Sequence, residues 1–309
     1  MNMMDGATQA SLSVASLVGA KKRYGGVEAL AGFDLTLPRG QVLALLGANG
    51  AGKTTAIGLM LGLIAPDAGQ VELFGQAPQL LAARRRMGVM LQSAALPDTS
   101  TIKELLEATR AYYPAPLSYA ECESLAGLQG LGKRQYGKLS GGQQRRVQFA
   151  LAICGDPELL FLDEPTTGLD IEARQQIWLA IRQLRERGAA VLLTTHYLEE
   201  AEALADHVVV IDRGRAVANG SVDAIRAKVS EQRIRCRSDV KPEIAMNWPG
   251  VLQATCEGDH LTLRVEDAVQ VLPLLLSADP SLSALEVGRA GLADAFLAIT
   301  RESTKESHV

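Results

Sequence analysis

Three stretches of the sequence carry residues whose types and spacing suit phosphate chemistry, and the first is rich in glycine. It directly follows the wholly apolar run Val42–Leu46 and contains Gly47, Ala48, Asn49, Gly50, Ala51, Gly52, Lys53, Thr54 and Thr55. Glycines let consecutive backbone N–H groups curl round phosphates at the start of a helix. We expect Lys53 to reach the β and γ phosphates and the Thr54 hydroxyl to ligate Mg²⁺. A plain glycine-rich turn between a strand and a helix is the alternative, but it does not require Lys-Thr at this spacing.

The second stretch is an apolar run, Leu159–Leu162, that ends in two acids, Asp163 and Glu164. Because the carboxyl ends of parallel strands meet at one edge of a sheet, these carboxylates are expected beside the glycine-rich loop. Asp163 would hold Mg²⁺ through water, while Glu164 would orient or deprotonate an attacking water during phosphoryl transfer. The alternative is that Asp-Glu-Pro simply ends a strand and starts a turn.

The third stretch, Leu139-Ser140-Gly141-Gly142-Gln143-Gln144, precedes a helical pattern that runs to Ile153. Ser140 and Gln143 have the spacing of a capping box, so a well-capped helix is one interpretation. That interpretation does not explain two glycines in the first turn, where each costs about 1 kcal/mol relative to alanine. We therefore expect close approach by another group, and the start of a helix favours an anion.

The surrounding patterns predict an α/β fold that brings these stretches together. Apolar strands alternate with helices, which indicates a mostly parallel sheet. The strands are expected at Ser11–Leu17, Phe33–Leu37, Val42–Leu46, Leu159–Leu162, Ala190–Thr194 and His207–Ile211. Helices are expected at 102–113, 119–128, 172–187 and 198–205, the first two within a helical insert.

Beyond residue 230 the pattern changes to short strands, which predicts a small second domain. These strands are expected at Arg233–Arg237, Leu252–Cys256 and Leu261–Val265, with a hairpin around Gly258 and Asp259. We expect an ATP-binding domain at residues 1–230, with its helical insert at about 93–155, and a C-terminal accessory domain at residues 231–309.

In their order along the chain, the three stretches and the insert resemble the nucleotide-binding subunits of ATP-binding-cassette (ABC) transporters. The resemblance covers roughly Leu12 to Ala227. It implies a P-loop NTPase core with an antiparallel β subdomain, ATP and Mg²⁺ as cofactors, and hydrolysis of ATP. It also implies that two copies stack head to tail as a homodimer, so that Ser140, Gly141, Gly142 and Gln143 face the partner's γ-phosphate.

The resemblance assigns further roles at four positions. Tyr24 matches the aromatic residue that stacks on adenine, although a half-buried strand tyrosine is the alternative. Asp170 matches the loop that crosses the dimer interface, although Asp is common in turns. The following Ile171 departs from the proline of many relatives, and we expect little consequence.

The other two positions follow apolar strands. Gln92 matches the glutamine that touches the metal or the water, whereas by residue type alone it would be a surface residue. His196 matches the histidine that contacts the γ-phosphate, although a lone histidine is more often structural. Lys53, Gln92, Glu164 and His196 are therefore the catalytic candidates, and Thr54, Gln92 and Asp163 are the metal ligands.

Composition argues against several other classes of protein. The 31 Lys and Arg residues against 35 Asp and Glu give a net charge of −4, whereas nucleic-acid binders usually show a basic excess. The four cysteines have no paired spacing, so neither zinc nor a disulfide framework is suggested. No apolar run approaches the roughly 20 residues of a spanning helix, and the polar start shows no secretory signal. We expect a cytoplasmic protein on the inner face of the membrane through a separate permease.

Three functions compete for this pattern. The first is an ATPase that drives export through a separate membrane permease. Export is favoured by the resemblance of Leu285–Val287 and Gly291–Leu297 to the tails of drug and polysaccharide exporters, although an ordinary amphipathic helix packing on a sheet is the alternative for this stretch. The second is a soluble ABC-type ATPase acting on nucleic acid or ribosomes; such relatives usually carry two cassettes or a long coiled insertion, and neither is present. The third, a small-molecule kinase, leaves Ser140–Gln143 unexplained.

Overall fold

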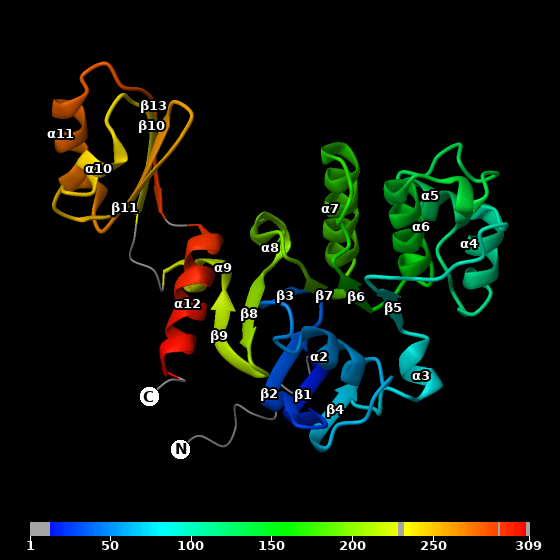
Figure 1. Ribbon diagram of the computed structural model, residues 1–309. Coiled ribbons are helices and arrows are strands. Elements are labelled where there is room, and N and C mark those ends of the chain that lie inside the picture. Colours follow the sequence, from blue (N-terminus) through cyan, green and yellow to red (C-terminus); the bar gives the residue numbers. More distant parts are fainter. Residues whose placement is uncertain (1–12, 228–231, 290, 307–309) are drawn as a thin grey trace. The chain divides into compact units, whose positions relative to one another are not determined.

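A computed structural model describes residues 13–227, 232–289 and 291–306. The chain divides into two compact units, Met1–Ser221 and Val222–Val309 (Figure 1). Among the described residues, none of the helices has both the length and the apolar character needed to cross a membrane. The predicted boundary at residue 230 falls among residues 228–231, which lie outside the described residues, so it stays a prediction.

The centre of the first unit is a six-stranded sheet in the order β5-β6-β7-β3-β8-β9. All neighbouring strands are parallel except β8 and β9, which are antiparallel. The strands are β3 (Val42–Leu46), β5 (Met87–Met90), β6 (Leu159–Asp163), β7 (Ala190–Thr194), β8 (His207–Asp212) and β9 (Arg215–Ser221). The mostly parallel sheet expected from the sequence is confirmed.

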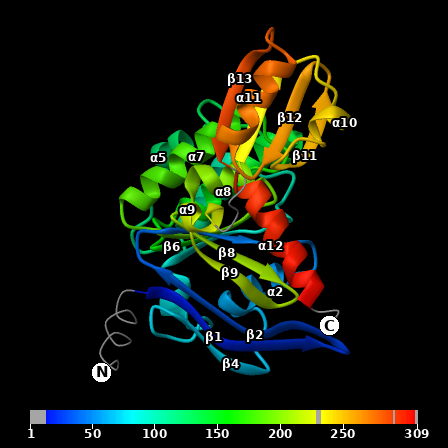
Figure 2. The same ribbon diagram turned by 90° about the vertical axis from the view of Figure 1, so that its left-hand side faces the viewer.

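Both faces of this sheet are covered, which explains why its strands are apolar throughout. On β6, Leu160 and Leu162 face one buried cluster, whereas Leu159 and Phe161 face another. Figure 1 shows helices α6 and α7 on the first side and helix α2 on the second, and Figure 2 shows α2 with the small antiparallel sheet on the second side. These helices are α2 (Lys53–Met60), α6 (Gly141–Ile153) and α7 (Ile171–Glu186).

The second side is completed by an antiparallel sheet in the order β2-β1-β4. Its strands are β1 (Ser13–Tyr24), β2 (Val27–Pro38) and β4 (Ala68–Leu73). The predicted strands 11–17 and 33–37 were too short, because β1 and β2 continue as a hairpin through polar residues such as Lys21 and Lys22. Residues 11 and 12 lie outside the described part of the chain.

The helical insert follows β5 and contains α4 (Ile102–Arg110), α5 (Tyr119–Leu125), a 3₁₀ turn at Tyr136–Lys138 and α6. Thr101, Ser118 and Ser140 each form a capping box with the Glu or Gln three residues later. The predicted ends at residues 113 and 128 are too late by three residues each, since the last residues form turns. Two short helices, α3 (Leu81–Arg84) and α8 (Leu198–Leu204), complete the first unit.

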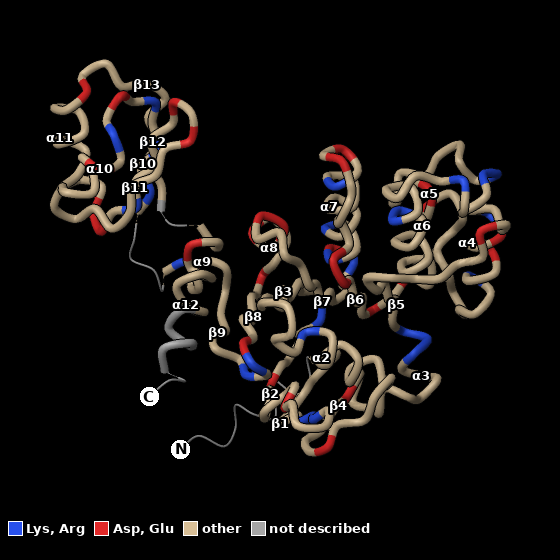
Figure 3. The backbone as a smooth tube through the Cα atoms, in the orientation of Figure 1, with Lys and Arg blue, Asp and Glu red and all other residues tan. Residues whose placement is uncertain are grey.

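The basic run Arg84–Arg86 lies at the end of α3, as Figure 3 shows, and its last member has a structural partner. Arg86 donates two hydrogen bonds to Glu158, at 2.5 and 3.0 Å. The hydrogen bond from Arg86 is the main cause that holds the pKa of Glu158 at about 2. This pair joins the chain just before β5 to the chain just before β6.

In the second unit the elements follow the order β-α-β-β-α-β, with one further helix before them and one after them. It contains α9 (Val222–Arg226), β10 (Gln232–Arg237), α10 (Pro242–Ala245), β11 (Val251–Glu257), β12 (His260–Val265), α11 (Ala268–Ala278), β13 (Ser283–Arg289) and α12 (Leu292–Glu306). The sheet order is β11-β12-β10-β13, with every pair antiparallel, which is the split β-α-β arrangement. The predicted hairpin at Gly258 and Asp259 is present. Helix α12 contacts α9.

Candidate functional site

The glycine-rich loop runs from the end of β3 into α2, and two of its glycines have no room for a side chain. A Cβ at Gly47 would lie 2.4 Å from the carbonyl oxygen of Ile211 on β8. Gly52 has φ +114°, and a Cβ there would lie 2.6 Å from the carbonyl oxygen of Ala29 on β2. The loop is thus pressed between the two sheets, and only glycine tolerates these positions.

The first turn of α2 leaves its backbone N–H groups available to a ligand. Gly52 is the N-cap, and it has no side chain that could accept a hydrogen bond from this turn. The Ala56 N–H donates to the Gly52 carbonyl oxygen, a bond at the start of the helix. Helices α4, α5, α6 and α7, by contrast, begin with a side-chain cap. Unpaired N–H groups at a helix start form a ready anion site, and Thr54 and Thr55 lie in this turn.

The Lys53 side chain contacts the backbone of this loop. Its ammonium group donates hydrogen bonds to the carbonyl oxygens of Gly47, at 2.6 Å, and Ala48, at 3.0 Å. Burial lowers the pKa of Lys53, while the charges of Glu164 and Asp163 act in the opposite direction. The ammonium group is therefore within electrostatic reach of both acids that end β6.

The two acids are fixed by the neighbouring strand β7. Asp163 accepts a hydrogen bond from the hydroxyl of Thr194, and the backbone N–H of Glu164 donates to the Thr194 carbonyl at 3.0 Å. Glu164 has φ +52°, a left-handed conformation that is costly for a residue with a side chain. This turn directs the Glu164 side chain away from β6 and toward the residues that follow β5 and β7.

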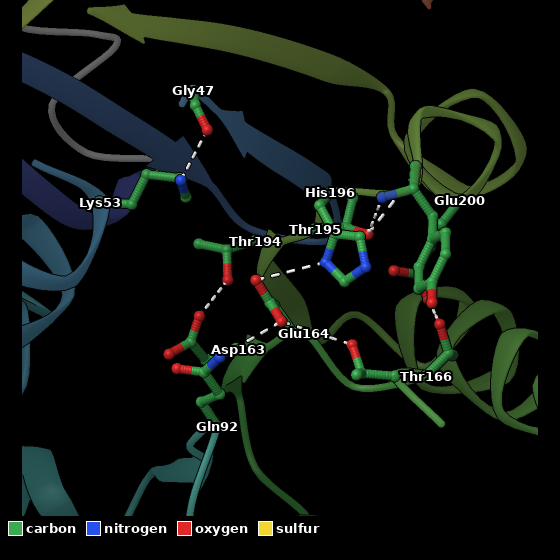
Figure 4. Close-up of polar contacts among 12 residues, drawn as sticks. Gly47, Lys53, Gln92, Asp163, Glu164, Thr166, Thr194, Thr195, His196 and Glu200 are labelled. Carbon is green, nitrogen blue, oxygen red and sulfur yellow. Dashed lines mark hydrogen bonds and ion pairs between the residues drawn. The ribbon is translucent and has the colours of Figure 1, made fainter. Parts of the chain in front are cut away.

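Three side chains surround the Glu164 carboxylate (Figure 4). His196 Nδ1 lies 3.3 Å from Oε1, and the Gln92 amide and the Thr167 hydroxyl lie 3.5 and 3.4 Å from Oε2. These contacts are long, so the carboxylate is oriented without being fully occupied. The structure thus brings together Lys53, Gln92, Asp163, Glu164 and His196 from four separate segments.

Sequence reasoning missed the residues that support this cluster. Thr194, Thr167 and Arg145 contact the acids or their backbone. Thr194 ends an apolar strand beside β6, which is a signal that could have identified it. Arg145 shares one helix face with buried Phe149 and Ala152, and a charged residue on such a face is a second signal.

Glu200 is a further residue that the sequence did not indicate. It is fully buried and accepts hydrogen bonds from the Thr166 hydroxyl, at 2.8 Å, and the Trp178 indole, at 3.0 Å. Thr166 belongs to the turn after Glu164. Glu200 therefore ties helix α8 to the segment between the acids and Asp170.

The Ser140–Gln143 stretch forms the start of α6. The Ser140 hydroxyl accepts from the Gln143 N–H at 3.2 Å, and the Gln143 side chain accepts from the Ser140 N–H at 3.1 Å. A Cβ at Gly141 would meet no atom within 4 Å, whereas one at Gly142 would lie 3.4 Å from Leu169. Among the described residues, no hydrogen bond joins this stretch to the glycine-rich loop of the same chain, and the helices that the two stretches begin, α6 and α2, pack into different buried clusters.

Two other candidates lie at element ends. Tyr24 ends β1 with half of its surface exposed, in the hairpin that leads into β2. Asp170 is the N-cap of α7, and its side chain accepts from the Ala173 N–H at 2.8 Å. Asp170 thus caps α7 within its own chain, and this structural role does not depend on any contact with a second copy.

The metal candidates are Thr54, Gln92 and Asp163. No cluster of three or more His, Cys, Asp or Glu side chains with metal-binding geometry occurs in the part of the chain that the structure describes. Mg²⁺ at nucleotide sites is usually held by one or two carboxylates, water and substrate phosphates, not by an all-protein cage. One carboxylate, a hydroxyl and an amide beside a phosphate loop fit that chemistry.

Comparisons with known proteins show the family of the chain. The ABC transporter family matches residues 30–167. The daunorubicin/doxorubicin resistance ATP-binding protein DrrA of Streptomyces peucetius is 36% identical over 302 residues, which cover 91% of each chain. The chain belongs to the ABC transporter family of ATP-binding proteins. The Nod factor export ATP-binding protein I of Rhizobium sp. (strain N33) is also similar, with 35% identity over 94% of this chain and 98% of that protein.

Solved structures show the same fold for this ABC ATPase. An ATP-binding subunit of an ABC transporter aligns with a TM-score of 0.64 and 29% identity, covering 70% of this chain and 93% of that one. A dimeric post-hydrolysis cassette bound to ADP and Pi aligns with a TM-score of 0.61 and 24% identity, covering 67% and 98%. The P-loop NTPase fold expected from the sequence is confirmed.

Proposed function

We propose that this chain hydrolyses ATP to power export of a substrate through a separate transmembrane permease. The observation that carries the proposal is the convergence of Lys53, Asp163 and Glu164, with Gln92 and His196, at one edge of the parallel sheet. Support for export comes from the drug-resistance and Nod-factor-export proteins, which match most of the chain, the second unit included.

The chain's own groups divide the chemistry between binding and transfer. Lys53 and the uncapped N–H groups of α2 hold the phosphates, and Tyr24 stacks on the adenine. Glu164 orients the attacking water and accepts its proton, while His196 and Gln92, which both contact Glu164, orient the γ-phosphate and the water. Thr54, Gln92 and Asp163 hold Mg²⁺, which when bound neutralises charge on the phosphates.

The remaining predicted residues act across a dimer in this proposal. Ser140, Gly141, Gly142 and Gln143 form an exposed helix start that is separate from the phosphate loop of their own chain. The open space at Gly141 admits close approach by a phosphate held by a second copy. Asp170 lies in the loop that follows Glu164 and would contact that copy.

We place the working complex on the inner face of the cell membrane, held there by its permease. The alternative partner, nucleic acid or ribosomes, gains no support from the relatives, whose names refer to drug resistance and to export. The charge pattern also lacks a basic excess.

Turnover of ATP by the full chain, alone and with candidate partners, tests the function. We expect turnover to rise when the chain is reconstituted in lipid vesicles with the integral membrane protein that co-purifies with it. DNA and ribosomes should leave turnover unchanged. Stimulation by DNA or ribosomes, without stimulation by the membrane protein, would replace export with the alternative.

Substitution of Ser140 by Arg tests the composite site. The bulky cation should leave ATP binding by the monomer within about twofold of normal, because Ser140 serves the neighbour's nucleotide. ATP-dependent dimerisation and hydrolysis should both be lost, as measured by size-exclusion chromatography and phosphate release. Normal turnover in this variant would show that the site is complete within one chain.

A further inference from the structure

Arg145 is a buried cation that bonds backbone atoms at two separate places around the catalytic cluster. Only 7% of its surface is exposed. Its Nη1 donates to the carbonyl oxygens of Leu91, at 2.8 Å, and Gln92, at 3.1 Å. Its Nη2 donates to the carbonyl oxygens of Asp163 and Glu164, each at 2.6 Å. One guanidinium thus spans the ends of β5 and β6.

The bond to Glu164 supports a strained position. Glu164 has φ +52°, a conformation that persists only where the surroundings hold it in place. The Thr194 carbonyl accepts from its N–H at 3.0 Å, and Arg145 donates to its carbonyl. The Glu164 backbone is therefore held at its N–H and at its carbonyl group. The Thr167 N–H also donates to that carbonyl, at 3.3 Å, so loss of Arg145 would leave the carbonyl with this longer bond alone.

The bond to the Gln92 carbonyl connects Arg145 to a second residue of the same cluster. Gln92 and Glu164 are far apart in sequence, yet their side chains meet at 3.5 Å. Their carbonyl groups share one rigid guanidinium, whose planar fork can address several acceptors at once. Arg145 thus bonds the backbone of both residues, and no hydrogen bond from Arg145 to the Glu164 carboxylate occurs among the described residues.

Arg145 also lies on the helix that begins with Ser140. Helix α6 runs from Gly141 to Ile153 without a break, so Arg145 is one turn inside the same rigid element. The Gln148 side chain accepts from Arg145 at 2.9 Å and fixes the guanidinium from within the helix. A shift of the start of α6 would therefore also move the Arg145 guanidinium, which bonds the carbonyl groups of Glu164 and Gln92.

Burial without a function would make this a costly residue. Burial lowers the pKa of Arg145, and the charges of Asp163 and Glu164 act against that effect. Its Nε atom is buried and has no partner in the described part of the chain, as is also true of Arg146 and Arg174. An apolar side chain would fill the space without these costs, so packing alone does not account for an arginine here.

We propose that Arg145 is a positioning residue that links the Ser140 end of α6 to Glu164 and Gln92 of the same chain. In the dimer, engagement of one nucleotide by Ser140–Gly142 then adjusts the catalytic geometry at the other nucleotide. This coupling between the two nucleotides rests on the proposed function, in which each site is formed by two chains. The positioning of Glu164 by Arg145 within one chain does not depend on that arrangement.

Arg145→Gln and Arg145→Lys, in the full chain, test the positioning role. Both should lower kcat about 10- to 100-fold, the scale expected when a reacting group is misplaced by about 1 Å. The Kd for ATP should stay within about twofold, because Lys53 and the α2 N–H groups are untouched. The lysine variant keeps the charge but cannot span both strand ends, so it also separates geometry from charge.

Arg146→Gln is the matched control. Arg146 is the next residue of α6, and its guanidinium donates to the Gly127 carbonyl at the end of the α5 segment, away from the acids. The control should keep kcat within about twofold of normal. An equal loss of kcat in the Arg146 and Arg145 variants would overturn the proposal, since a general disturbance of α6 would then explain both.

A double-mutant cycle with Glu164→Gln gives the decisive outcome. If Arg145 acts through Glu164, Arg145→Gln should lower kcat far less in the Glu164→Gln background than in the normal chain. Equal fold-losses in both backgrounds would contradict the proposal, and so would normal kcat in Arg145→Lys, the variant to be used if Arg145→Gln does not fold. If Glu164→Gln alone keeps normal turnover, the proposed function fails instead, which distinguishes the two failures.

Discussion

Single residues around the phosphate loop differ in how far the sequence could predict them. Gly47, Lys53 and Glu164 belong to short motifs with fixed spacing, and the structure places all three at the same edge of the sheet. Arg145 and Thr194 belong to no such motif in this sequence. Their contacts form only after separate segments have folded together, so the missing information is the tertiary arrangement itself.

Lys53→Ala should weaken both the binding and the hydrolysis of ATP. The substitution removes the ammonium group whose charge interacts with those of Asp163 and Glu164, and with it a charge contact to the phosphates before and during transfer. We expect a loss of about tenfold or more in each, measured by nucleotide titration and phosphate release. Lys103→Ala, at an exposed position on α4, is the control. Unchanged affinity and turnover in Lys53→Ala would remove the phosphate-loop assignment.

Among the elements, strands that are apolar throughout were predictable, and strands with polar residues were not. The predicted strands 42–46 and 190–194 match β3 and β7 in full, because burial on both faces leaves an unmistakable apolar run. Strand β4 contains three exposed residues in succession, and β9 alternates weakly. These strands are stabilised by backbone pairing with their neighbours, which leaves little trace in the sequence.

The contact between α6 and β5 depends on one glycine. A Cβ at Gly88 would lie 1.9 Å from the Ala152 carbonyl oxygen, so Gly88→Ala must push α6 away from the sheet. Overpacking of this kind costs about 1 to 3 kcal/mol of unfolding free energy. Urea unfolding should show that loss, and turnover should fall because Arg145 moves with α6. Gly26→Ala, where an added Cβ meets no atom within 4 Å, is the control, and equal stability of the two variants would contradict the prediction.

At the scale of the whole molecule, the nucleotide motifs all lie within the first unit, Met1–Ser221. The change of pattern after residue 230 predicted a second domain, and its hairpin at Gly258 was found where the sequence indicated. The strand β13 and the helix α9 were not predicted. Helix α9 is only five residues long, and β13 is exposed at the edge of its sheet, so neither has a strong apolar period.

A chain that ends at Ser221 should fold and bind ATP. The first unit has its own two buried clusters, one on each face of the six-stranded sheet, as an independent domain requires. Circular dichroism and ATP titration should show a cooperative unfolding transition and an affinity within about threefold of the full chain. An unfolded product would mean that the second unit is needed to complete the cassette.

The ATP turnover of Glu164→Gln tests whether Glu164 activates the attacking water. Glutamine keeps the size of the side chain but cannot accept the proton of the attacking water, and a general base contributes about 10²- to 10⁴-fold. Turnover should fall by an amount in that range while ATP binding persists, so the variant should form a dimer with ATP and Mg²⁺. Glu199→Gln, at an exposed position, should behave normally. Hydrolysis by Glu164→Gln at close to the normal rate would contradict the account, because another group would then activate the water.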